Sequence, residues 1–332
     1  MHSRMPTLRG STMRASALKR GVRMAAVTSR ASEPTAVPKA SPRAGDGRWA
    51  LPISPPYNVL ITGSTKGVGK ALAEEFLRSG DSVIITSRSA VRVAEAVAEL
   101  AEKYGTDRVK GQACNVSDGV EVRALAEYAK GALGKVDLWI NNAGTNAYKY
   151  GPLVDSTDEE LEEIVSTNVL GVMVCCREAV RLMREQNSGG HVFNMDGAGA
   201  DGGATPRFAA YGATKRSLAQ LGKSLQAELG QADIKNVGVH NLSPGMVTTE
   251  LLMTGADTPM SKFFINCLAE TAEEVAATIV PQVRRVPIES VSSLNGGITS
   301  SYVQYLTKQK AYSQILSRLL LGRRKDRFVR EE

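Results

Sequence analysis

The sequence predicts an α/β fold: a doubly wound parallel sheet in a single domain, with a helical extension at the carboxyl terminus. Strand-like apolar runs alternate with segments of helical periodicity between residues 57 and 242. A glycine-rich turn directly follows the first of these runs, and a helical pattern begins inside that turn. Such alternation implies that the strands lie parallel and that the connecting helices cover both faces of the sheet.

The expected elements follow one another in a regular order. Each strand candidate is a short run rich in Val, Ile and Leu, and each helix candidate repeats apolar residues every three or four positions. The expected strands cover 57–62, 82–86, 108–114, 136–140, 191–194 and 237–242. The expected helices begin at 67 and cover 89–104, 118–133, 157–186 and 209–229. A ligand is then expected beside the carboxyl ends of the strands, where parallel sheets of this kind open a crevice.

The first 45 residues differ in composition from the rest of the chain. They hold nine Lys or Arg but one acidic residue, Glu33, and they are rich in Ser, Ala and Thr. This composition is typical of an organellar transit peptide, with a disordered basic arm as the alternative. The whole chain carries a net charge of +7, but residues 46–332 hold 32 basic and 33 acidic residues, a net charge of −1. A nucleic-acid-binding surface is therefore not expected.

The glycine-rich turn has the form that cradles a phosphate. It reads Thr62-Gly63-Ser64-Thr65-Lys66-Gly67-Val68-Gly69 and joins the first strand candidate to the first helix candidate. We expect Gly63 to permit a tight turn, Gly67 to let the backbone approach a pyrophosphate, and Gly69 to let the helix pack closely on the strand. The amides at the start of the helix then face the anion. An ordinary glycine-rich turn is the alternative when this segment is considered alone.

Tyr211 and Lys215 are four residues apart in the expected helix 209–229, so they share one of its faces. A positive charge beside a phenol favours the phenolate, and we expect Lys215 to lower the pKa of Tyr211 from its usual value near 10. The pair could then transfer a proton near neutral pH. Alone, a Tyr and a Lys at this spacing are more often exposed neighbours without a function. The pair is significant here because the glycine-rich turn lies upstream.

With these two motifs the chain resembles the short-chain dehydrogenase/reductase family, from about Asn58 to Leu268. Further matches are Asn141-Asn142-Ala143-Gly144, Asn168 within Ser166-Thr167-Asn168-Val169, and Ser243-Pro244-Gly245-Met246-Val247-Thr248-Thr249. The resemblance implies an NADP-binding Rossmann domain over 57–300, preceded by a transit peptide (1–45) and a linker (46–56) and followed by an extension (301–332). It implies that Tyr211 is the catalytic acid/base, that Lys215 also binds the nicotinamide ribose, and that Asn168 holds a water linking Lys215 to solvent. The implied cofactor-binding residues are Gly63, Ser64, Thr65, Lys66, Gly67, Val68, Gly69, Ser87, Arg88, Asn115, Val116, Asn142, Ala143, Gly144, Lys215, Pro244, Gly245, Val247 and Thr249.

The end of the second expected strand favours NADPH over NADH. NAD-specific folds of this kind place a carboxylate there for the ribose 2′-hydroxyl, whereas this chain has Ser87 and Arg88. Arg88 can pair with a 2′-phosphate, and Lys66 adds a second cation nearby. The alternative is a solvated pair of surface cations.

One element of the family pattern is missing. Members normally carry a Ser about 13 residues before the tyrosine, and this chain has no Ser or Thr between residues 194 and 204. Losing such a carbonyl-polarising hydroxyl commonly costs a few kcal/mol, roughly 3, of transition-state stabilisation. In one explanation, backbone amides of the glycine-rich loop or a protonated Asp196 replace the serine hydroxyl. In the other, the protein is a slow or inactive enzyme that binds pigment or a partner.

Residues 191–215 and the tail from Tyr302 narrow the resemblance to the chlorophyll(ide) b reductases of chloroplasts, of the type without membrane spans. That resemblance implies reduction of the 7-formyl group of chlorophyll b or chlorophyllide b, on the stromal side and peripheral to the thylakoid membrane. It implies a membrane-bound reductase partner and a light-harvesting complex as partners, with a homo-oligomer possible. A generic plastid carbonyl or 3-oxoacyl reductase is the alternative enzyme.

The same resemblance gives two local expectations. The loop after residue 196 lacks bulky side chains, which suits a flat macrocycle. Apolar residues after Gly245 are expected to cover the substrate or, alternatively, to face the core: Leu251, Leu252, Met253, Met260, Phe263, Phe264 and Ile265.

No metal site is expected. The four cysteines, Cys114, Cys175, Cys176 and Cys267, lack the spacing of a metal-binding pair, and His2, His191 and His240 are too far apart in sequence to suggest a cluster. We expect His191 and His240 to have structural roles.

Overall fold

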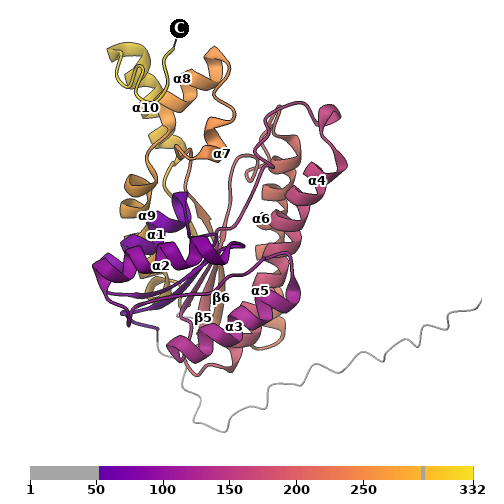
Figure 1. Ribbon diagram of the computed structural model, residues 1–332, viewed down its shortest axis with the longest axis vertical. Coiled ribbons are helices and arrows are strands. Elements are labelled where there is room, and N and C mark those ends of the chain that lie inside the picture. Colours follow the sequence, from indigo (N-terminus) through magenta and orange to yellow (C-terminus); the bar gives the residue numbers. More distant parts are fainter. Residues whose placement is uncertain (1–51, 293–295, 332) are drawn as a thin grey trace, which may run out of the picture. The chain divides into compact units, whose positions relative to one another are not determined.

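Seven parallel strands form one sheet in the order β3-β2-β1-β4-β5-β6-β7 (Figure 1). The order reverses direction between β1 and β4, and this reversal opens a crevice at the carboxyl ends of the strands. The predicted doubly wound parallel sheet is therefore confirmed, with one strand, β7, that the sequence did not indicate. The strands are β1 (Asn58–Thr62), β2 (Ser82–Thr86), β3 (Val109–Gly111), β4 (Leu138–Asn141), β5 (Gly190–Met195), β6 (Val237–Ser243) and β7 (Tyr302–Gln304).

This computed structural model describes residues 52–292 and 296–331. The expected transit peptide (1–45) and most of the expected linker (46–56) lie outside the described residues.

Helices cover both faces of the sheet because successive strand residues point to opposite sides. Val59 and Ile61 of β1 pack in one hydrophobic core, whereas Leu60 between them packs in the other. The first core is closed by α1 (Gly67–Arg78), α2 (Ala90–Tyr104) and α9 (Ala272–Glu289). The second is closed by α3 (Gly119–Leu133), α5 (Val172–Glu185) and α6 (Ala209–Gln231).

The expected helix 157–186 is helical but not uniform. A Thr157 capping box starts α4 (Asp158–Val165), and α5 completes the helix. Between them, residues Ser166–Gly171 form a π-helical segment, η2. Such wider turns arise mostly at functional sites, and this one contains Asn168.

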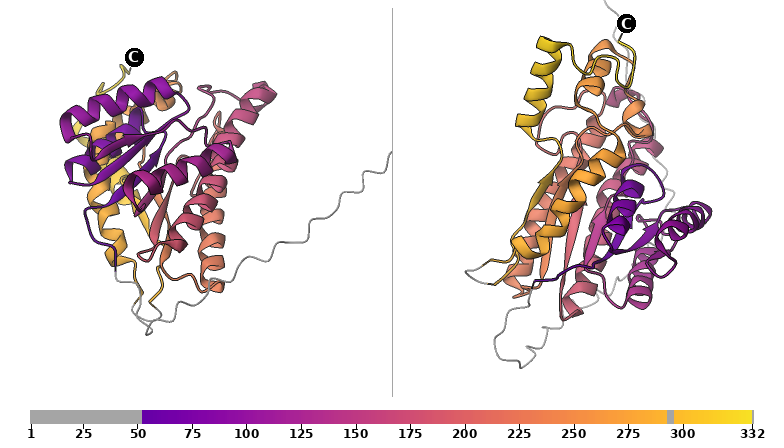
Figure 2. Two further views of the ribbon diagram at one scale, coloured as in Figure 1. Left: turned by 60° about the horizontal axis from the view of Figure 1, so that its bottom comes forward. Right: turned by 90° about the vertical axis from the view of Figure 1, so that its left-hand side faces the viewer.

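The chain beyond β6 builds a cap at the carboxyl end of the sheet (Figure 1). It consists of α7 (Glu250–Met253), α8 (Pro259–Leu268) and, after β7, α10 (Lys308–Leu321). Outside this cap, a short 3₁₀ turn, η1 (Leu153–Asp155), lies between β4 and α4. Figure 2 shows α10, in yellow, beside α8. Within the described ranges, no helix is long and apolar enough to cross a membrane.

Two buried histidines join β5 to β6. Nδ1 of His191 is 3.0 Å from Nε2 of His240, and the two rings stack. His240 Nδ1 accepts a hydrogen bond from the Ser301 amide at 3.0 Å, so the proton of His240 is on Nε2 and is donated to His191. The structural role expected for both histidines agrees with this arrangement. Burial lowers the pKa of His191 to about 4 and that of His240 well below its usual value.

Because both pKa values are depressed, the pair stabilises the fold fully above pH 6.5, and this contribution is lost as pH falls toward about 4. The expected slope is about 1.4 kcal/mol per pH unit for each histidine. Urea unfolding of the wild type and of His191→Gln between pH 4.5 and 7 measures it. The variant, which cannot take up that proton, should show a shallower dependence, and identical slopes would contradict a neutral buried pair.

Candidate active site

A cleft of about 1530 Å³ opens at the carboxyl edge of the sheet. Dedicated ligand pockets measure about 300–1,000 Å³, so this cleft has room for a dinucleotide and a large second ligand. All the cofactor-binding residues expected from the sequence line it except Ser64. Ser64 is fully buried, and its hydroxyl donates to the Ile61 carbonyl at 2.7 Å and accepts from the Thr86 amide at 3.0 Å. Ser64 therefore joins β1 to β2 rather than facing the cleft.

The start of α1 suits a phosphate. Its N-cap residue, Lys66, makes no side-chain capping bond, and the first turn carries no acidic residue. The amides of that turn therefore keep their hydrogen-bonding capacity and the positive end of the helix dipole for an anion. Gly67 and Val68 of this turn line the cleft. These residues fit the pyrophosphate of a dinucleotide.

Gly69 permits the tight packing behind this turn. A Cβ at Gly69 would lie 2.4 Å from Nδ2 of Asn142 and 2.5 Å from the carbonyl oxygen of Gly63. Asn142 occupies that space because its Nδ2 donates to the carbonyls of Thr62, at 2.8 Å, and Gly63, at 3.0 Å. Asn142 thus ties the end of β4 to the end of β1.

Three cations line the cleft: Lys66 at the start of α1, Arg88 after β2, and Arg92 in the first turn of α2. Arg88 is well exposed and lies 3.8 Å from Glu163, a weak ion pair that leaves its guanidinium free to turn. Lys66 is engaged with Glu250 at 2.5 Å and stands over the ring of Tyr148. Arg92 was not identified from the sequence, because it lies inside α2 rather than directly after the strand.

Tyr211 and Lys215 both reach the end of β5 from α6. Lys215 is 3% exposed, and its ammonium donates to the carbonyl of Met195 at 3.0 Å. The hydroxyl of Tyr211 lies against Gly197, where an added Cβ would stand 2.4 Å away from it. The two side chains thus contact the residues on either side of Asp196.

The expected lowering of the phenol pKa is wrong for this structure. Burial raises the pKa of Tyr211 above its usual value, and the charge of Asp196 adds to the effect. Lys215 lies 5.5 Å from the centre of the ring of Tyr211 rather than at its oxygen. Burial also lowers the pKa of Lys215 to about 8, although Asp196 opposes that shift.

Asn168 is completely buried and does not face the cleft directly. Its Oδ1 accepts from the Thr145 amide at 2.9 Å, and its Nδ2 donates to the Thr145 carbonyl at 2.8 Å and to Thr214 Oγ1 at 3.1 Å. A Cβ at Gly144 would lie 3.3 Å from Asn168 Oδ1 and 3.4 Å from Lys215 Nζ. Asn168 therefore lies near Lys215 but uses its side chain to hold the loop after β4.

Asp196 lies at the end of β5, within the segment 194–204 that holds no Ser or Thr. It lines the cleft at the end of β5 and is 6% exposed. The hydroxyl of Tyr302, on β7, donates to its Oδ2, whereas its Oδ1 is buried without a hydrogen-bond partner among the described residues. Burial raises its pKa, against the opposing influence of Tyr302, Ser243 and Lys215. Tyr302 was not identified from the sequence, because no local pattern joins it to a residue 106 positions away.

Two glycines of the glycine-rich loop, Gly197 and Gly199, pack closely on α6. Besides Gly197 against Tyr211, a Cβ at Gly199 would lie 2.7 Å from Cα of Gly212. These two glycines let the loop approach α6, whereas Gly202 and Gly203 are exposed, and the suitability of the loop for a macrocycle stays a prediction.

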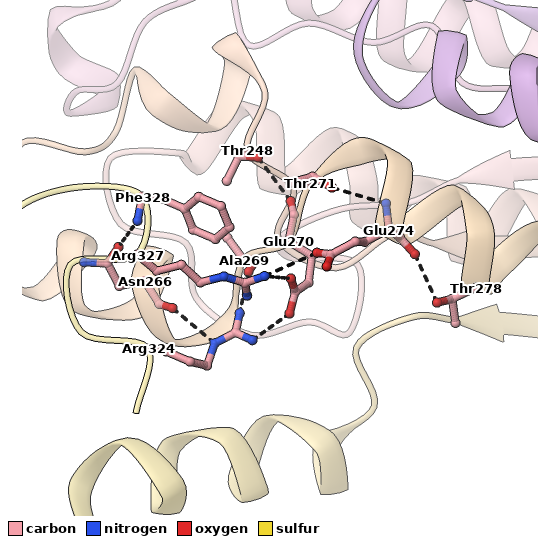
Figure 3. A network of polar contacts seen from close by, with 10 residues as sticks. All are labelled: Thr248, Asn266, Ala269, Glu270, Thr271, Glu274, Thr278, Arg324, Arg327 and Phe328. Carbon is pink, nitrogen blue, oxygen red and sulfur yellow. Dashed lines mark hydrogen bonds and ion pairs between the residues drawn. The ribbon is translucent and has the colours of Figure 1, made fainter. Parts of the chain in front are cut away.

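The carboxyl-terminal segment fixes the wall of the cleft that follows β6 (Figure 3). Arg324 donates to Glu270 Oε1 at 2.7 Å, and Arg327 pairs with Glu270 Oε2 at 2.7 Å. Burial alone would raise the pKa of Glu270, but hydrogen bonds led by that from Arg327 hold it well below its usual value. The Glu270 carbonyl accepts from the amide of Thr248, which lines the cleft. The tail thus stabilises this wall of the cleft through Glu270.

Some of the apolar residues after Gly245 line the cleft and others do not. Leu251 and Leu252 line the cleft, as expected for a substrate cover. Phe263 and Phe264 contact each other and lie outside the cleft lining, with Arg318 over the ring of Phe263. Met260 is 65% exposed.

Over residues 52–292 and 296–331, no three His, Cys, Asp or Glu side chains gather in a way that could hold a metal ion. The four cysteines are free and buried.

Known proteins resemble this chain in both sequence and structure. The sequence profile of the short chain dehydrogenase family matches residues 57–259. The chain is 57% identical over 281 residues to chlorophyll(ide) b reductase NOL of Arabidopsis thaliana, covering 85% of this chain and 79% of that protein. It is 54% identical over 294 residues to the protein of the same name from Oryza sativa subsp. japonica, covering 89% and 84%. The structure of 3-ketoacyl-(acyl-carrier-protein) reductase from Brucella melitensis complexed with NADH matches with a TM-score of 0.63 at 25% identity, over 77% of this chain and 98% of that one.

The packing around Gly69 gives a testable prediction. Gly69→Ala should destabilise the fold by about 1–3 kcal/mol and weaken dinucleotide binding, because the added methyl displaces Asn142 or the backbone of Gly63. Gly131→Ala is the matched control, since a Cβ there meets nothing within 4 Å and Ala favours a helix interior. Chemical unfolding and cofactor titration measure both. Equal stability of the two variants would contradict the close approach.

Proposed function

The chain belongs to the short-chain dehydrogenase/reductase family, and from that membership we propose that it is a chlorophyll(ide) b reductase. It reduces the 7-formyl group of chlorophyll b or chlorophyllide b to a 7-hydroxymethyl group, the first step of converting chlorophyll b to chlorophyll a and of chlorophyll degradation. The observation that carries this proposal is the 57% and 54% identity to two proteins of that name over 85% and 89% of this chain.

The size of the cleft is consistent with such a substrate. A volume of about 1530 Å³ exceeds the usual size of a ligand pocket, and Leu251 and Leu252 supply apolar surface in its lining. A generic carbonyl or 3-oxoacyl reductase would need less room.

Tyr211, Lys215 and Asn168 have different roles in the proposed reaction. A bound reduced nicotinamide supplies the hydride. Tyr211 is half-buried in the lining of the cleft and donates a proton to the oxygen that becomes an alkoxide. Lys215 places a positive charge beside the ring of Tyr211 and binds the nicotinamide ribose. Asn168 holds the loop after β4 and, through the backbone of the π-helical segment, a water that links Lys215 to solvent.

NADPH is the proposed cofactor. Arg88 and Arg92 line the cleft near the end of β2, where a 2′-phosphate would lie, and that strand is followed by Ser87 rather than an acid. Lys66 is a weaker candidate because it is already paired with Glu250. The remaining expected cofactor residues, except Ser64, line the same cleft and are proposed to bind the dinucleotide.

We further propose a chloroplast location on the stromal side, peripheral to the thylakoid membrane. Leu319, Leu320 and Leu321 at the end of α10 are 64–71% exposed, and Arg323 and Lys325 follow them. Such a surface suits an anionic membrane or the proposed partners there, a membrane-bound reductase and a light-harvesting complex. Residues 1–45 would be the transit peptide that directs import.

A homo-oligomer is also proposed. Val165, Leu170 and Met173, in α4, η2 and α5, are 43–50% exposed and give this part of the molecule an apolar surface suited to a second copy.

The reaction is tested with the purified protein, NADPH and chlorophyll b. We expect 7-hydroxymethyl chlorophyll as product, and Tyr211→Phe should lower kcat/KM by at least about 100-fold, because it removes the proton donor without removing the ring. Tyr312→Phe removes an exposed phenol and serves as the control. The absence of product with the wild type, or undiminished turnover in Tyr211→Phe, would reject the proposed activity.

The cofactor preference depends on Arg88. Arg88→Asp should reduce the ratio of NADPH to NADH catalytic efficiency by roughly 10–100-fold, since it exchanges a charge-assisted hydrogen bond to the 2′-phosphate for a repulsion. Arg285→Asp, an exposed cation on α9, is the control. Steady-state rates with both nucleotides measure the ratio, and an unchanged ratio in Arg88→Asp would sink the assignment.

A further inference from the structure

The chain continues well beyond the part that matches the family profile. That profile covers residues 57–259, whereas the structure describes the chain as far as residue 331. The last described residues, 322–331, follow α10 and lie against α8 and the start of α9 (Figure 3). We call this segment the strap. Its contacts are therefore a feature that the family profile does not include.

The strap is fastened to α8 through Asn266, which is completely buried. Oδ1 of Asn266 accepts from the amides of Phe328, at 2.7 Å, and Val329, at 3.0 Å. Its Nδ2 donates to the carbonyl of Val329 at 2.6 Å. An ion pair of 2.6 Å between Glu331 and Arg318 ties the end of the strap back to α10. Both the backbone and the end of the strap are thus held by specific bonds.

Arg324 joins the strap to the end of α8. Its backbone is left-handed, with φ of 64°, a conformation that a residue other than glycine keeps only where the surrounding contacts hold it. Its guanidinium donates to the carbonyls of Asn266, at 3.3 Å, and Ala269, at 2.6 Å. These carbonyls lie in the last turn of α8, where no further helical amide follows to satisfy them. Arg324 therefore caps α8 and is oriented toward Glu270, its third partner.

Glu270 connects the strap to the wall of the cleft after β6. Its buried carboxylate lies 2.7 Å from Arg324 and 2.7 Å from Arg327. Its backbone amide donates to the carbonyl of Met246 at 3.0 Å, and its carbonyl accepts from the amide of Thr248 at 2.9 Å. One residue thus pairs with the strap through its side chain and with the wall through its backbone.

The wall, residues 246–249, borders the part of the cleft that suits a dinucleotide. All four of its residues line the cleft. A Cβ at Gly67 would lie 3.4 Å from Cγ2 of Thr249, so the wall reaches the turn that fits the pyrophosphate. In the sheet, β6 is separated from β2, and hence from Arg88, by β1, β4 and β5. A dinucleotide with its 2′-phosphate at Arg88 therefore extends its nicotinamide half toward the wall.

We propose that the strap controls binding of the nicotinamide half of the cofactor. Arg324 and Arg327 are positioning residues that act through Glu270 and hold the wall in the form that binds this half. The inference rests on the proposed use of NADPH. Since coupling between two sites is reciprocal, docking of the strap strengthens cofactor binding, and bound cofactor holds the strap in place by the same factor.

Glu270→Gln tests the connection, because it keeps the size and the backbone pairing of the residue but removes the charge that both arginines share. The Kd for NADPH, measured from its fluorescence, should rise about 5–50-fold. The Kd for adenosine 2′,5′-bisphosphate, which contains only the adenine half, should stay within twofold. Glu273→Gln, an exposed glutamate in the first turn of α9, is the matched control. An unchanged Kd for NADPH, or an equal loss of both ligands, would overturn the proposal.

Arg327 offers a test from the side of the strap. Arg327→Met removes the ion pair but keeps the apolar stem, and it should weaken NADPH binding about as much as Glu270→Gln does. Arg327→Lys keeps the charge and should restore affinity to within about threefold of wild type. Arg330→Met, at an exposed arginine of the same strap, should bind as the wild type does. Equal affinity in Arg327→Met and Arg330→Met would contradict the positioning role.

Hydrogen exchange tests the coupling in the unaltered protein, so it does not depend on the folding of a variant. The amides of Phe328 and Val329 donate to Asn266 and exchange when the strap leaves it. Saturating NADPH should slow their exchange by the factor found for the Kd in Glu270→Gln, whereas adenosine 2′,5′-bisphosphate should not. A wild type that shows this protection but does not reduce chlorophyll b would refute the proposed reaction alone. A wild type that reduces chlorophyll b with NADPH without this protection would refute the role of the strap alone.

Discussion

The hydrogen bond from the Lys215 ammonium to the Met195 carbonyl is the contact on which the site depends. A buried ammonium is costly unless it is hydrogen-bonded, so α6 is held at the distance from β5 that satisfies it. Tyr211, one helical turn earlier, then lies against the chain just beyond Met195, where glycine alone fits. The glycine content of the loop after β5 follows from this packing and requires no substrate to explain it.

The part of the chain after β6 completes a site that the first six strands leave open. Tyr302 comes from β7, at the edge of the sheet, and Arg324 and Arg327 come from the segment after α10. Through Glu270 these arginines stabilise the wall that carries Thr248, and Tyr302 contacts Asp196, next to the residues that Lys215 and Tyr211 contact. A region that the sequence suggested was only an extension therefore contributes directly to the cleft.

Most strands of the sheet and much of the cleft lining could be predicted from the sequence. The positions of the strands and of the glycine turn depend on local patterns, so six strands and the lining residues around Gly67 were recognisable. The direction in which the pKa of Tyr211 is shifted could not be predicted, because it depends on burial by the rest of the fold rather than on the residue four positions away. Strand β7 is only three residues long and gives no periodic signal. Its pairing with β6, and hence the contact of Tyr302 with Asp196, is a property of the tertiary structure.

The protonation of the polar groups at the end of β5 is set by burial in the rest of the fold. Asp196 is 6% exposed, and burial raises its pKa against the opposing influence of Tyr302, Ser243 and Lys215. The same burial raises the pKa of Tyr211 and lowers that of Lys215, so one apolar environment sets the protonation of all three groups.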